Sequence, residues 1–130
     1  MVCERVNKSD VESAMGITFQ KEKASKLPSE LPYDYSGCEY TNLVLAEVSI
    51  NYYRKSNANV YPPGSKTKIL KNVSFPAKAV YNKSGDIYEL IGETPKGSKI
   101  LIVLNSSIKE NSKQYHHMLH LLEKLIHTFE

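Results

Sequence analysis

The C-terminal segment of the chain carries its densest group of side chains that can do chemistry. His116, His120, Glu123 and His127 follow one another at spacings of four, three and four residues, so a helix would place them on one narrow stripe. Two imidazoles at an i, i+4 spacing suit Zn²⁺, Cu²⁺ or Ni²⁺, and His116 with His120 is the predicted metal pair. His127 lies about 10 Å further along the helix axis, so the three histidines cannot share one ion without other ligands. The other interpretations are a solvated polar face and a sensor of acid pH.

The chain lacks the sequence signatures of common catalytic and nucleotide-binding sites. It contains no G-x-S-x-G, H-E-x-x-H or G-x-x-x-x-G-K-[ST] pattern, so no hydrolase elbow, metalloprotease helix or phosphate-binding loop is predicted. Cys3 or Cys38 would be a nucleophile only as a free thiolate near a histidine. A cytosolic thiol-dependent enzyme therefore stays as an alternative, but we expect no catalytic residue and no cofactor.

Length and charge limit the domain organisation and the partners. The chain has 130 residues, of which 41% are hydrophobic and 24% charged, and this fits a single domain over residues 1–130. Its net charge of +3 comes from dispersed lysines, with only two arginines, whereas nucleic-acid readout relies on concentrated arginine. We expect no nucleic-acid partner. No apolar run is long enough to cross a bilayer, so a membrane would be reached only through a lipid anchor outside this chain.

Hydrophobic periodicity predicts an α+β fold. Residues 7–16 form a predicted short helix, capped by Ser9 and Glu12 or, two residues earlier, by Asn7 and Asp10. Residues 21–36 show no sustained period and are predicted to be a long loop. Alternating residues predict antiparallel strands over 39–53, 77–81, 87–92 and 99–104, and an apolar stripe predicts an amphipathic helix over 113–129. We expect an antiparallel sheet of four to six strands packed by a short N-terminal helix and a longer C-terminal helix.

Tyrosine is abundant, with nine residues and no tryptophan. Most tyrosines lie in predicted strands, where the residue is a good β-former. Tyr33 and Tyr35 in the long loop and Tyr61 in a proline-rich turn are the exceptions. Because a tyrosine ring has an apolar face and a polar tip, we predict that these three form an exposed patch for a partner or ligand.

Two motifs carry a resemblance to a protein family. From the residues alone, Cys3 and Cys38 either form one disulfide or remain two unrelated thiols. The segment C-E-R-V-N-K-S-D-V-E-S-A-M-G over residues 3–16, together with S-G-C-E-Y over residues 36–40, resembles small bacterial envelope lipoproteins of unknown function. The resemblance implies that Cys3 pairs with Cys38. It also implies an extracytoplasmic domain, secreted, periplasmic or lipid-anchored, that binds an envelope protein or small ligand without catalysis. The later order of strands and terminal helix is also similar to that of these lipoproteins. The overall layout of sheet and helices is similar to that of PsbP-like proteins, which concerns the fold alone.

Overall fold

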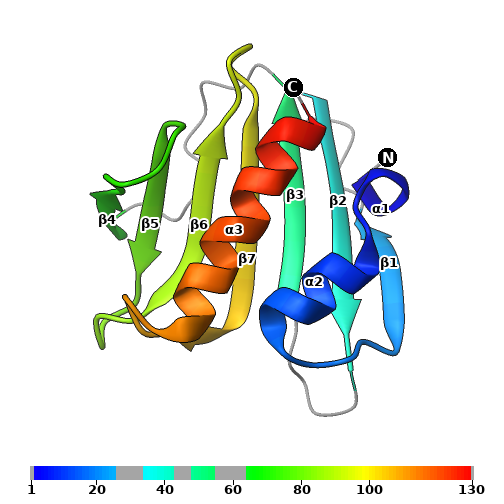
Figure 1. Ribbon diagram of the computed structural model, residues 1–130, viewed down its shortest axis with the longest axis horizontal. Coiled ribbons are helices and arrows are strands. Elements are labelled where there is room, and N and C mark those ends of the chain that lie inside the picture. Colours follow the sequence, from blue (N-terminus) through cyan, green and yellow to red (C-terminus); the bar gives the residue numbers. More distant parts are fainter. Residues whose placement is uncertain (1, 26–33, 43–47, 55–63, 130) are drawn as a thin grey trace.

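A computed structural model describes residues 2–25, 34–42, 48–54 and 64–129. These residues form one antiparallel sheet of seven strands, in the order β1-β2-β3-β7-β6-β5-β4, with the helices on one of its faces (Figure 1). The elements along the chain are α1 (Val2–Arg5), α2 (Lys8–Met15), β1 (Lys21–Ser25), β2 (Asp34–Thr41), β3 (Val48–Arg54), β4 (Lys66–Ile69), β5 (Ala77–Tyr81), β6 (Ile87–Glu93), β7 (Lys99–Ile108) and α3 (Lys113–Thr128). The predicted α+β class is confirmed, although the sheet has more strands than the four to six expected.

The additional strands lie where the sequence shows no hydrophobic alternation. Part of the predicted loop over residues 21–36 is instead β1, and β2 begins at Asp34. The single strand predicted over residues 39–53 is wrong, because β2 and β3 are separate strands that pair antiparallel from Tyr40↔Val48 to Asp34↔Arg54. β1 and β4 are the two edges of the sheet, and their side chains are mostly polar and exposed. An edge strand of this kind carries no buried stripe that a periodicity could reveal.

Helix α2 has both of its predicted ends. Asn7 is the N-cap and its side chain accepts a 3.0 Å hydrogen bond from the backbone amide of Ser9, so the earlier of the two predicted cap positions is used. Gly16 ends the helix at φ +73°, a left-handed conformation that favours glycine. Glu12 accepts instead from the backbone amide of Phe19 at 2.7 Å, and this bond fixes the chain as it turns toward β1.

Helix α3 supplies much of the core between the helices and the sheet. Ser112 caps it by accepting a 3.1 Å hydrogen bond from the amide of Tyr115. The buried side chains of the helix are Tyr115, Met118, Leu121, Leu122, Leu125 and Ile126. The helix lies on β6 and β7, where a side chain on Gly92 would come within 2.9 Å of Ile126 Cδ1. The missing side chain of Gly92 therefore lets α3 approach the sheet closely.

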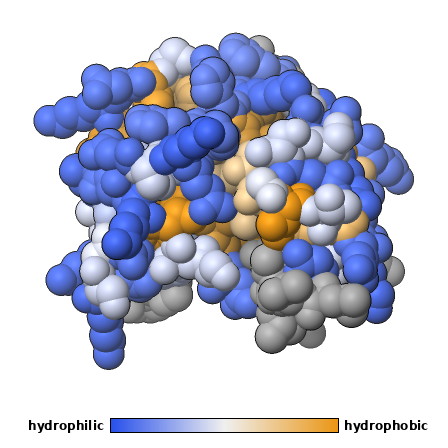
Figure 2. Space-filling model, turned by 60° about the horizontal axis from the view of Figure 1, so that its bottom comes forward, coloured by the Kyte–Doolittle hydropathy of each residue, from blue (hydrophilic) through white to orange (hydrophobic). Residues whose placement is uncertain are grey.

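A second, smaller apolar cluster lies on the opposite face of the sheet, which we call the back face. Its buried members are Val80, Ile91 and Leu101, and half-buried Tyr53, Tyr88 and Val103 pack against them. Seen from the lower end of Figure 1, hydrophilic residues dominate, and apolar residues are visible in recesses between them (Figure 2).

Candidate functional site

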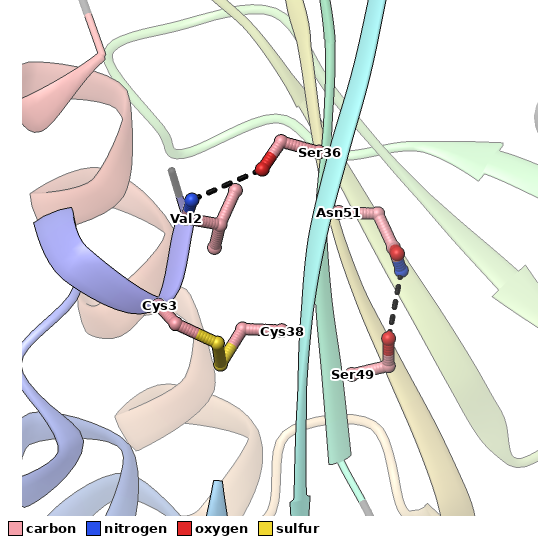
Figure 3. The surroundings of a disulfide bond; sticks show 6 residues. All are labelled: Val2, Cys3, Ser36, Cys38, Ser49 and Asn51. Carbon is pink, nitrogen blue, oxygen red and sulfur yellow. Dashed lines mark hydrogen bonds between the residues drawn. A yellow bond between two sulfur atoms is a disulfide. The ribbon is translucent and has the colours of Figure 1, made fainter. Parts of the chain in front are cut away.

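A disulfide between Cys3 and Cys38 joins α1 to β2 (Figure 3). The sulfur atoms are 2.02 Å apart and the Cα atoms 5.1 Å apart, so the pairing that the family resemblance implied is present in the structure. Next to this bond, the backbone amide of Val2 donates to Ser36 Oγ at 3.0 Å. Because both cysteines are in the bond, neither is a free thiolate in this form of the protein.

The back face beneath the disulfide carries a small polar network. The hydroxyl of Tyr35 donates to Asn51 Oδ1 at 2.5 Å, and Asn51 Nδ2 donates to Ser49 Oγ at 3.1 Å. The ring of Tyr35 also packs on that of Tyr53, with centroids 5.0 Å apart. Tyr35 is therefore a half-buried member of the sheet surface. Tyr33 and Tyr61, the other members of the predicted patch, lie outside the described residues.

Gly37 makes room for this network, so Gly37→Ala is expected to destabilise the protein by about 1–3 kcal/mol. An added Cβ would lie 2.7 Å from Asn51 Oδ1 and closer still to the Tyr35 hydroxyl. Urea unfolding measures the loss. In a Tyr35→Phe background, which lacks the closest atom, the same substitution should cost measurably less. Equal losses in the two backgrounds would mean that the hydroxyl does not set the requirement for glycine.

A groove of about 690 Å³ runs between the polar sides of α2 and α3. Its walls are Asp10 and Ser13 of α2 and His117, His120, Glu123, Lys124 and His127 of α3, with Ala14 and Leu121 as apolar members. Lys124 Nζ reaches across to Asp10 Oδ2 at 3.0 Å. The groove thus brings three imidazoles, two carboxylates and one ammonium group onto a single surface.

The structure divides the predicted histidine stripe. His120, Glu123 and His127 line the groove, whereas the exposed His116 is not among its walls. The His116 ring instead stacks on Tyr115, with centroids 5.4 Å apart. His117 was not part of the predicted stripe. It lines the groove only because α2 lies beside α3, and the spacing of residues along α3 does not reveal that α2 packs there.

The distances between possible metal ligands favour a site away from the histidine stripe. Within the described parts of the chain, the group of three whose ligand atoms all lie within 4.8 Å of one another is Cys3, Glu22 and Cys38. The groove histidines do not form such a set of three. Metal binding by His116 and His120 stays a prediction. The histidine stripe would supply at most two of the ligands of one ion.

Glu89 is a buried carboxylic acid in strand β6. It is only 4% exposed, and it pairs in register with Val80 and Val103 on the back face. Among the described residues its Oε2 atom has no hydrogen-bond partner. Burial raises the pKa of the Glu89 carboxyl to about 7, because the charged form is poorly solvated there. The register of β6 against β5 and β7 shifts next to this residue.

Comparisons with known proteins found no match to this chain. No protein-family model matches it, and neither the curated proteins nor the solved structures contain a match. Within the described residues, no helix has both the length and the apolar character that are needed to cross a membrane.

Proposed function

We propose that the protein is a non-catalytic binding domain that works outside the cytosol, in the bacterial cell envelope or in secreted form. The disulfide between Cys3 and Cys38 is the observation that carries this proposal. Disulfides persist in oxidising compartments and are rare in the cytosol, where thiol systems keep cysteines reduced. The bond has a structural task here, because it fastens the four-residue helix α1, which is too short to be stable alone, to the sheet.

The groove between α2 and α3 is the surface that we assign to the ligand or partner. Polar groups of both charge signs line it, together with the largely buried side chains of Ala14 and Leu121. Binding sites commonly combine an apolar surface with a few fixed polar groups. The Lys124–Asp10 ion pair spans the groove from one helix to the other.

Cell fractionation tests the proposed compartment. The native protein should separate with an extracytoplasmic marker enzyme and away from a cytosolic one. Recovery of the protein with the cytosolic marker would overturn the proposal. The same fractions, probed before and after membrane washing with detergent, would distinguish a lipid-anchored form from a freely secreted one.

Transition-metal binding is the second candidate function, because three histidines line one groove. Calorimetry on the oxidised protein with Zn²⁺, Cu²⁺ and Ni²⁺ should show micromolar binding. His120→Ala is expected to weaken that binding by at least about tenfold, as loss of a ligand does. His116→Ala is the matched comparison: a loss there indicates the predicted His116–His120 pair, and no loss indicates the groove residues. Absence of micromolar binding would eliminate this function.

A further inference from the structure

Three elements bring a cluster of metal-binding side chains together beneath α1. Cys3 comes from α1, Glu22 from β1 and Cys38 from β2, and their ligand atoms lie within 4.8 Å of one another. The register explains the placement of Glu22. Ala24 pairs with Cys38 and Glu22 with Tyr40, and alternate residues of a strand share a face. Glu22 and Cys38 are therefore diagonal neighbours on the face that α1 covers.

In the oxidised protein the two sulfurs are bonded to each other and cannot act as thiolate ligands. A dithiol reductant changes this. It breaks the Cys3–Cys38 bond by thiol–disulfide exchange, supplies two electrons and is itself oxidised to a disulfide, while the protein gains two thiols. When a cation binds, each thiol loses its proton to solvent and becomes a thiolate.

We propose that the reduced protein binds one zinc-like divalent cation through the Cys3 and Cys38 thiolates and the Glu22 carboxylate. Two thiolates and one carboxylate are a donor set that Zn²⁺ accepts, with solvent in the remaining position. The partly exposed Cys3 and the exposed Glu22 give a cation access from solvent. The bound cation replaces the covalent link between α1 and β2, so the same residues fasten the helix in both redox states. This inference does not rest on the groove. It concerns the reduced protein, whereas the compartment proposed above keeps the Cys3–Cys38 bond oxidised.

Titration with Co²⁺ tests the site spectroscopically. The whole protein is reduced with a dithiol, freed of reductant under argon and titrated with Co²⁺ as the probe. We expect near-ultraviolet sulfur-to-cobalt charge-transfer bands and the visible bands of four-coordinate cobalt, saturating at equimolar metal and reversed by Zn²⁺. The oxidised protein should show no charge-transfer bands, because its sulfurs are bonded to each other. Absence of the charge-transfer bands from the reduced protein, or their presence in the oxidised protein, would overturn the proposal.

Variants identify the ligands. Glu22→Gln should weaken Co²⁺ binding by at least about tenfold, since even outer partners of metal ligands have effects of that size. Cys3→Ser/Cys38→Ser, which removes both thiols, should abolish the charge-transfer bands. Glu39→Gln is the matched control, because Glu39 follows Cys38 directly but pairs with Ser49 on the back face. Equal affinity in Glu22→Gln and wild type would remove Glu22 from the site, and visible cobalt bands without charge-transfer bands would place the metal on ligands other than the two cysteines.

Discussion

Replacing both cysteines in the variant Cys3→Ser/Cys38→Ser is expected to lower the free energy of unfolding by about 3–4 kcal/mol. The bond joins residues 35 apart in sequence, and closing a loop of that length restricts the unfolded chain. Loss of the bond also frees α1, whose Arg5 donates to the backbone carbonyl of Thr128 and lies 4.5 Å from the centroid of the Phe129 ring. Urea unfolding followed by circular dichroism measures the change.

Two controls separate the effect of the bond from the effect of the new side chains. Chemically reduced wild-type protein should lose about as much stability as the double variant, provided that divalent metals are removed. Ser36→Ala removes the hydrogen bond from the Val2 amide and keeps the disulfide, and it should cost only about 1 kcal/mol. If the free energy of unfolding of the double variant were less than about 1 kcal/mol below that of wild type, α1 would be held by packing alone.

Neutralising the buried carboxylate in Glu89→Gln is expected to stabilise the protein at pH 8 by about 2–3 kcal/mol. The pKa of Glu89 is raised from 4.5 to about 7 in the folded protein. A raised pKa means that the folded state holds the proton more tightly than the unfolded state does. The contribution of Glu89 to stability is therefore complete below pH 4.5 and is lost as the pH rises through 7. The glutamine remains neutral throughout and carries no such loss.

Urea unfolding of wild type and variant at pH 5, 7 and 8 measures this difference. The stability gained by Glu89→Gln should grow between pH 5 and 7 and change little above the folded pKa. Glu93→Gln is the matched control, because Glu93 is an exposed residue at the end of the same strand, and its pH profile should follow that of wild type. Parallel pH profiles for Glu89→Gln and wild type would show that Glu89 is solvated or paired in the folded protein.

The sequence predicted those helices and strands whose buried residues repeat regularly within a single segment of the chain. Helix α3 repeats apolar residues from Tyr115 to Phe129 at a helical spacing, and these residues are buried except for the half-buried Leu119. The β5–β6 and β6–β7 hairpins have short turns that leave little choice of partner. The edge strands β1 and β4 were missed because pairing with β2 and β5 defines them, and their own polar residues carry no burial pattern.

The candidate sites show the same division between local and long-range information. His120 and Glu123 were found from spacing on one helix, whereas Asp10 joins them only because α2 packs beside α3. Glu22 carries no motif and reaches the disulfide through strand register. Glu89, in a mostly apolar strand, resembles a solvent-facing residue. It is buried because Val80 and Val103 flank it on the back face, and that is information about neighbouring strands.

The state of the two cysteines inside living cells is the most direct test of an extracytoplasmic binding domain. Cells that make the native protein are quenched in acid and treated with a polyethylene-glycol maleimide, and the protein is then located on a gel. Unreduced protein should carry no tag, and protein reduced before labelling should carry one tag on each of Cys3 and Cys38. Two tags on unreduced protein would show that the bond does not form in its own compartment and would contradict the proposed location.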